Sequence, residues 1–213
     1  MDPIKYKIGY IDEESTWIGV FQRNLGEDFD VVIFPLSEDT TLEGIVNAIQ
    51  EENLDCLVVD YELKESSMVT FNGDEIIERV RLTNPEFPML IITGHEENEV
   101  VTVVDDADIV RTKNELAERT PLFIKRIKGK ILSHRKKIGE IDSEIKSLAT
   151  KKVEVGLSVL EENRLNDLYK ELDRINPIER GLPGVMYERT NITQLSELVK
   201  EAQLVLEAIK SKK

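Results

Sequence analysis

The chain has 213 residues, of which 40% are hydrophobic and 33% are charged, and its formal net charge is −14. Its single cysteine, Cys56, lies inside an apolar run, which excludes an intrachain disulfide framework and favours a small buried side chain. The N-terminal residues contain no apolar signal core, and no stretch approaches the ~18 apolar residues that a membrane span needs. We therefore expect a cytoplasmic protein that makes no contact with a membrane.

Charge is distributed unevenly along the chain. Residues 1–120 carry 28 acidic and 9 basic side chains, a net charge of −19, whereas residues 121–213 carry 14 and 19, a net charge of +5. Such an acidic first half argues against contact between that half and nucleic acid. Carboxylates gathered at one site would instead suit a hard cation such as Mg²⁺.

Short apolar runs alternate with amphipathic segments of helical length in the first half of the chain. Strands are predicted at residues 7–12, 31–34, 54–60, 88–93 and 107–112, with helices between them at residues 16–25, 41–52, 73–83 and 96–104. Runs rich in Val and Ile are typical of strands that are buried on both faces. The alternation predicts an α/β fold, a doubly wound parallel sheet of five strands with helices on both faces.

Polar residues stand at the ends of four of these strands. Asp12 and Glu13 end the first strand, Asp60 ends the third, Thr93 ends the fourth and Lys113 follows the fifth. In the flavodoxin-like strand order 2-1-3-4-5, the first and third strands are neighbours, and ligands bind beyond their carboxyl ends. That order would bring Asp12, Glu13 and Asp60 together. Clustered carboxylates, a hydroxyl and a lysine are the groups that hold a divalent cation and stabilise phosphoryl transfer to a carboxylate.

On these residues, the segment from residue 4 to about residue 122 resembles the receiver domain of two-component response regulators. The resemblance implies that Asp60 accepts a phosphoryl group from a histidine kinase or another phosphodonor, and that Thr93 and Lys113 contact that group. It implies a Mg²⁺ site whose ligands are Asp12, Glu13, Asp60 and the backbone carbonyl of Glu62. No dedicated catalytic activity is expected beyond uptake of the phosphoryl group from a donor and its loss by autodephosphorylation.

Several positions depart from the family's pattern. No proline follows Asp60 closely, and the loop after Asp60 is longer than is usual in the family. Val110 occupies a position where the family usually has an aromatic side chain that swings inward on phosphorylation. Without that aromatic, we expect activation to be read through the long loop and the helix at residues 96–104. Glu62 and His95 stand where residues of the family flank the attacking water.

The second half of the chain is predicted to be helical. Apolar residues recur at alternating three- and four-residue spacings over residues 124–148, a pattern typical of a coiled-coil seam. A second stripe covers residues 165–175, after a capping box that begins at Ser158. The two stripes predict an antiparallel coiled-coil hairpin, and a third helix is predicted at residues 193–210.

These patterns predict a receiver domain at residues 1–122 and a helical output region at residues 123–213. The seam at residues 124–148 is much longer than its partner stripe, so part of it must be covered by something else. We therefore expect a homodimer through residues 120–176, and an output that consists of protein–protein contact gated by phosphorylation.

Two alternatives stay open at this point. One is a pseudo-receiver scaffold that never turns over phosphate and uses the same helical arm constitutively. The other is a regulator that binds nucleic acid through a basic helix, because residues 125–152 hold 10 basic and 3 acidic side chains, a net charge of +7. No aromatic residues interleave these charges, so nucleic acid is the less favoured partner. A solvated face, or pairing with the acidic first half, explains the same charges.

Overall fold

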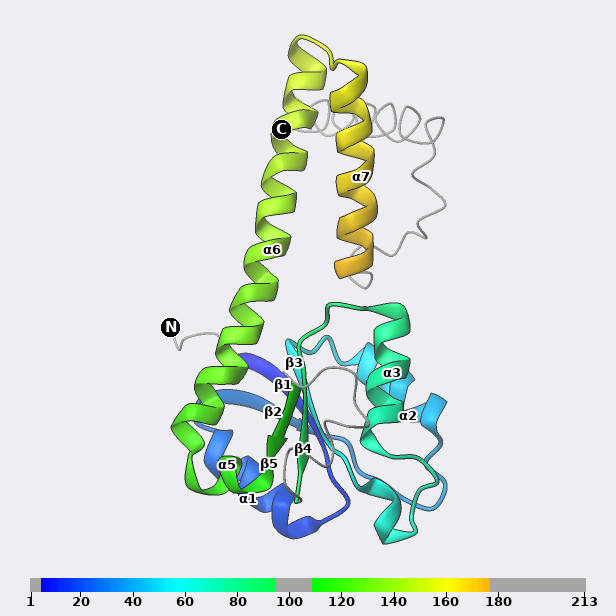
Figure 1. Ribbon diagram of the computed structural model, residues 1–213, viewed down its shortest axis with the longest axis vertical. Helices are drawn as coiled ribbons and strands as arrows, with labels where there is room; N and C mark the ends of the chain where they lie inside the picture. Colours follow the sequence, from blue (N-terminus) through cyan, green and yellow to red (C-terminus); the bar gives the residue numbers. More distant parts are fainter. Residues whose placement is uncertain (1–4, 95–108, 177–213) are drawn as a thin grey trace, which may run out of the picture. The chain divides into compact units, whose positions relative to one another are not determined.

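The computed structural model describes residues 5–94 and 109–176. The chain divides into two compact units, the first of which holds residues 1–139 and 174–178. The first unit contains a five-stranded parallel sheet in the order β2-β1-β3-β4-β5 (Figure 1). This order confirms the predicted α/β fold and its doubly wound sheet. The predicted helices at residues 96–104 and 193–210, together with His95, lie outside the described residues.

The strands are short, and helices connect them. The strands are β1 (Tyr6–Ile11), β2 (Phe29–Ile33), β3 (Cys56–Asp60), β4 (Met89–Thr93) and β5 (Val110–Thr112). The helices that follow them are α1 (Ser15–Leu25), α2 (Leu42–Glu51), α3 (Gly73–Thr83) and α5 (Lys113–Glu118), with a 3₁₀ turn, η1, at Leu63–Ser66. Strand β2 begins two residues before its predicted start, because Phe29 and Asp30 pair with the first two residues of β1.

The register of the sheet aligns the carboxyl ends of its central strands. Ile11, the last residue of β1, lies opposite Val59, the penultimate residue of β3. The next residue in each case is an aspartate, so Asp12, just after β1, lies beside Asp60, the last residue of β3. Every residue of β3 and β4 is buried, as strands covered on both faces should be.

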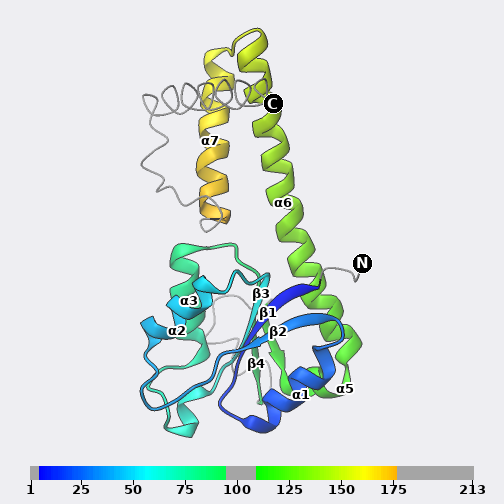
Figure 2. The ribbon, with the colours of Figure 1, turned by 180° about the vertical axis from the view of Figure 1, so that it is seen from behind.

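Each face of the sheet has its own apolar core. Helices α2 and α3 cover one face (Figure 2), with Ile45, Ile49, Ile76 and Val80 among their buried side chains. The other face is covered by α1, α5 and the beginning of the long helix α6 (Thr120–Glu154). There the buried side chains of the helices are Phe21, Leu25, Leu116, Phe123, Ile127 and Ile131.

The beginning of α6 packs on the sheet, although its apolar residues belong to the predicted coiled-coil seam. Ile127 and Ile131 are at most 1% exposed and pack in the core of the first unit, against the same face of the sheet as Phe21. Three- and four-residue spacing produces an apolar stripe on any helix that is covered along one side, whether by a second helix or by a sheet. The first unit thus extends along α6 as far as Gly139. A functional boundary near residue 122 stays a prediction.

The second unit contains the rest of α6 and, as far as Asp173, helix α7 (Val159–Ile175), which form an antiparallel hairpin. Arg164 donates two hydrogen bonds to the carboxylate of Glu144, at 2.8 and 2.7 Å. Ser158 and Glu161 form the predicted capping box, in which the Ser158 backbone N–H donates to Glu161 Oε2 at 3.0 Å. The hairpin prediction is confirmed, and its buried residues are Ile141, Ile145, Leu165, Leu168 and Leu172. Among the described helices, none is both long and apolar enough to cross a bilayer.

Candidate functional site

Carboxylates from two neighbouring strands meet at one edge of the sheet. Side-chain oxygens of Asp12, Glu13 and Asp60 all lie within 4.8 Å of one another. Thr93 ends the adjacent strand β4, and Lys113 is the first residue of α5. Asp12, Asp60 and Thr93 are at most 1% exposed, and Lys113 is 5% exposed. The structure thus gathers the three predicted carboxylates and buries the predicted hydroxyl and lysine with them.

Lys113 balances part of this negative charge. Its Nζ atom lies 3.1 Å from Asp60 Oδ1 and 3.2 Å from Asp12 Oδ2. A third carboxylate, that of Glu14, accepts a hydrogen bond from the same nitrogen at 3.2 Å. The Trp17 ring lies beside the ammonium, with its centroid 5.5 Å away. One ammonium therefore serves three carboxylates, and a fourth, that of Glu13, lies in the same cluster.

Hydrogen bonds hold both aspartates in place. Asp12 Oδ1 accepts from the Glu14 backbone N–H at 2.8 Å, and Asp12 Oδ2 accepts from the Tyr10 hydroxyl. The Tyr10 ring is itself stacked on Phe21, with 3.9 Å between ring centroids. Asp60 Oδ2 accepts from the Glu62 backbone N–H at 3.1 Å. Asp60 Oδ1 faces the lysine as an ion pair and forms no directed hydrogen bond with any described residue, so one of its lone pairs is available.

Burial and crowding shift the pKa values of the site. Burial raises the pKa of Asp60 from 3.8 to about 7; Lys113 opposes this shift, while Asp12 and Glu13 add to it. Burial and the nearby Asp12 also raise the pKa of Glu13. Burial alone would lower the pKa of Lys113, but Asp60 and Asp12 raise it above its ordinary value. The carboxylates thus carry more negative charge than the lysine can balance, which favours binding of a cation.

The residues present fit a hard divalent cation. Glu13 Oε2 is buried and has no hydrogen-bond partner among the described residues. A buried carboxylate oxygen without a partner is costly, and a metal ion would satisfy it. The donors of the cluster are all oxygens, which Mg²⁺ prefers. The carbonyl of Glu62, the fourth predicted ligand, accepts from the Glu65 backbone N–H at 3.1 Å and keeps a second lone pair.

The sequence matches no protein-family model and no curated protein. Similar solved structures include the BeF3-activated receiver domain of DrrB, which is 21% identical, with 60% of this chain and 98% of that chain covered and a TM-score of 0.47. A response regulator receiver protein from Sinorhizobium medicae is 17% identical, with coverages of 60% and 94% and a TM-score of 0.47. The signal receiver domain of the putative response regulator NarL from Mycobacterium tuberculosis is 22% identical, with coverages of 60% and 99% and a TM-score of 0.44.

The strand order of the first unit is the one expected for a receiver domain, with the acidic cluster at the carboxyl ends of β1 and β3. The first unit has the predicted five-stranded doubly wound fold. Within this unit, Val110 is fully buried among the apolar residues under α2 and α3. Its side chain is therefore part of the core.

The long loop after Asp60 is closed and packed. Its ends meet where the Gly73 backbone N–H donates to the Tyr61 carbonyl at 3.0 Å, as in a compact Ω-loop. Lys64 forms an ion pair with Glu75 in the first turn of α3, at 2.5 Å. Three apolar side chains of this loop are buried in the core under α2 and α3, namely Leu63, Val69 and Phe71, while Met68 is 38% exposed.

Reasoning from the sequence missed several residues of the site, among them Tyr10, Trp17, Glu14 and Gly73. Glu14 contacts Lys113, and Gly73 packs directly against the backbone of Asp60. The run of three acids that ends at Glu14 was a visible signal for the first contact. A glycine just after a capping asparagine was a weaker signal for the second, because many helices begin in this way.

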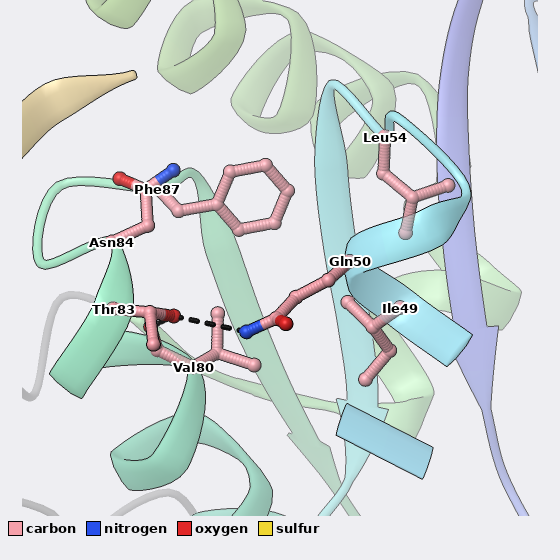
Figure 3. Close-up of a pocket in the computed structure, with 7 residues that line it drawn as sticks. All are labelled: Ile49, Gln50, Leu54, Val80, Thr83, Asn84 and Phe87. Carbon is pink, nitrogen blue, oxygen red and sulfur yellow. Dashed lines mark hydrogen bonds between the residues drawn. The ribbon is translucent and has the colours of Figure 1, made fainter. Parts of the chain in front are cut away.

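A separate cavity of about 190 Å³ lies between α2 and α3 (Figure 3). Its lining residues are Ile49, Gln50, Leu54, Val80, Thr83, Asn84 and Phe87. The Gln50 side-chain amide donates to Thr83 Oγ1 at 3.2 Å and bridges the two helices. Leu54 and Phe87 precede β3 and β4, so this cavity lies at the amino ends of the strands and shares no residue with the acidic site.

Proposed function

We propose that this protein is a response regulator whose Asp60 accepts a phosphoryl group in the presence of Mg²⁺, and whose helical region contacts a protein partner. The observation that carries the proposal is the buried Lys113 ammonium, which lies within 3.2 Å of both Asp60 and Asp12 beside a third carboxylate. An aspartate held in this way can act as a nucleophile whose product charge already has a counter-ion.

In the proposed reaction, a carboxylate oxygen of Asp60 attacks the phosphorus of the donor. A new P–O bond forms while the bond from phosphorus to the donor's imidazole nitrogen, or to acetate in acetyl phosphate, breaks and its electron pair leaves with the donor. Asp12, Glu13, Asp60 and the Glu62 carbonyl would hold Mg²⁺, which supplies positive charge next to the transferred group. The Lys113 ammonium and the Thr93 hydroxyl are the chain's own donors for the phosphoryl oxygens.

Uptake of a phosphoryl group from acetyl phosphate tests the proposal. With Mg²⁺, the intact mass of the full chain should rise by one phosphoryl group, and Asp60→Asn should abolish this gain. Removal of Mg²⁺ by a chelator should abolish it as well. Asp39→Asn, in an exposed loop, is the matched control and should keep full uptake. A phosphoryl group on another residue, or no uptake from any donor, would favour the pseudo-receiver.

Ion pairs within the first unit account for much of the positive charge on α6. Lys128 pairs with Asp28, Arg135 with Asp55, Lys137 with Glu86 and Arg126 with Glu115. These acids belong to the strongly acidic first half of the chain, so the basic helix face meets an internal partner. This pairing supports a protein partner over nucleic acid, and salt-dependent retention on DNA or RNA would contradict it.

The turn of the α6–α7 hairpin is the surface that we propose for the partner. Four aliphatic side chains there are between 68% and 81% exposed, namely Val153, Val155, Val159 and Leu160. Clustered exposed apolar side chains are typical of interaction sites. Light scattering on the full chain should show whether the partner is a second copy of this chain or a different protein. A dimer that Leu160→Lys converts to a monomer would identify a second copy, whereas a monomer would identify a different protein.

A further inference from the structure

Three carboxylates surround the Lys113 ammonium in this structure, and Glu14 accepts a hydrogen bond from it. An ammonium group carries three N–H donors. Three carboxylates stand within 3.2 Å of Nζ, those of Asp60, Asp12 and Glu14. A phosphoryl oxygen that approaches Lys113 must therefore compete with these carboxylates for the ammonium.

Glu14 is the carboxylate that can leave at the lowest cost. Its side chain is 53% exposed, while those of Asp60 and Asp12 are at most 1% exposed. A buried carboxylate that loses its partner stays desolvated, whereas an exposed one exchanges the ammonium for water. Asp12 and Asp60 also hold further hydrogen bonds that fix their orientation. The Glu14 carboxylate accepts a hydrogen bond from Lys113.

The backbone of Glu14 is anchored, so release needs only a side-chain rotation. Its N–H donates to Asp12 Oδ1 at 2.8 Å, and its carbonyl accepts from the Trp17 and Ile18 backbone N–H groups at 3.0 and 3.1 Å. These bonds hold residue 14 at the start of α1 whichever way the side chain points.

We propose that Glu14 is a displaceable counter-ion that holds Lys113 until an anion arrives and then yields its place. This inference rests on the proposed function, because the anion is the phosphoryl group bound for Asp60. Glu14 acts through Lys113 and is a positioning residue. While it is in place, it occupies a donor and adds a negative charge beside the site. It therefore competes with the phosphoryl group and slows phosphorylation.

Glu14→Gln removes the charge and keeps the length of the side chain. With Mg²⁺ and acetyl phosphate, this variant should be phosphorylated roughly two- to five-fold faster than the wild type, the range expected for a half-exposed ion pair. It should also bind inorganic phosphate roughly two- to five-fold more tightly, as measured by chemical-shift titration of the full chain. The matched control is Glu27→Gln, an exposed glutamate just beyond the other end of α1. It removes the same charge far from Lys113 and should change neither value.

The phosphorylation rate and the affinity for inorganic phosphate together distinguish a failure of this inference from a failure of the proposed function. If the wild type takes up no phosphoryl group, the proposed function fails, while tighter phosphate binding by Glu14→Gln would still show that Glu14 competes for Lys113. If the wild type is phosphorylated and Glu14→Gln changes neither the rate nor the phosphate affinity, the inference is overturned. An equal gain in Glu27→Gln would also overturn it, because the effect would then be one of net charge.

Discussion

A β-carbon on Gly73 would lie 2.1 Å from the carbonyl oxygen of Asp60. That contact is far shorter than any van der Waals distance, so a larger residue at position 73 must move either α3 or the candidate phosphoacceptor. The same β-carbon would also lie 2.9 Å from the Val59 side chain. The first residue of α3 thus constrains the backbone at the end of β3.

We predict that Gly73→Ala destabilises the protein by about 1–3 kcal/mol, as overpacking of a filled core does. It should also slow phosphorylation of Asp60, because the displaced atoms belong to that residue's own backbone. Urea unfolding and the acetyl phosphate assay measure the two effects. Gly19→Ala is the control, since a β-carbon there meets nothing within 4 Å and alanine favours a helix by about 0.4–1 kcal/mol. Wild-type stability in Gly73→Ala would contradict the predicted clash.

The pKa of Asp60 predicts how stability depends on pH without metal. The pKa of Asp60 is raised from 3.8 to about 7. Between these two pH values, Asp60 therefore keeps a proton in the folded protein that it releases in the unfolded chain. The Asp60 contribution to the free energy of unfolding should therefore fall as pH rises from about 4 to 7. Asp60→Asn should remove much of this slope, leaving a part that comes from Glu13, whose pKa is also raised.

Urea unfolding between pH 4 and 8, without added metal, measures this dependence. The difference between wild type and Asp60→Asn isolates the contribution of the one carboxylate, because all other groups titrate in both proteins. Asp39→Asn should keep the wild-type slope. Mg²⁺ should stabilise the wild type most above pH 7, where Asp60 is ionised. A difference that stays constant across this range would show that Asp60 ionises at its ordinary pKa.

A substitution at Ile127 tests whether this part of α6 belongs to a domain core or to a seam between two chains. Its side chain is fully buried in the first unit, so Ile127→Ala should destabilise that unit by about 2–5 kcal/mol. The loss should not depend on protein concentration, because residues of the same chain bury this side chain. Leu132→Ala, on an exposed part of the same helix, is the control and should have little effect. An unfolding midpoint of Ile127→Ala that rises with concentration relative to wild type would indicate an intermolecular seam.

The capping box at the start of α7 should stabilise the hairpin. Ser158→Ala removes the hydroxyl that accepts from the Glu161 backbone N–H, and should cost about 0.5–2 kcal/mol. Helical content near the hairpin turn, followed by amide hydrogen exchange, should report the loss. Ser147→Ala, at an exposed position inside α6, should be neutral or slightly stabilising. Equal exchange rates in the two variants would show that the cap contributes nothing.

The sequence by itself determined the alternation of strands and helices and the main groups of the candidate site, while the strand order was taken from the doubly wound fold. Apolar runs that end abruptly at Asp12, Asp60 and Thr93 place those residues at the carboxyl edge, since parallel strands all point the same way. The hairpin followed from two stripes and a capping box, which depend on spacing within a few neighbouring residues. These features are local, and local patterns can be read from one chain.

Only the tertiary structure decided which partner covers each stripe and which residues meet across the fold. Ile127 and Ile131 follow coiled-coil spacing yet pack on the sheet, because the same period serves any helix that is covered on one side. Glu14 and Lys113 are 99 residues apart, and Gly73 meets Asp60 through a single close approach between two backbones. Contacts of this kind depend on distances between packed elements, and residue spacing along the chain does not encode them.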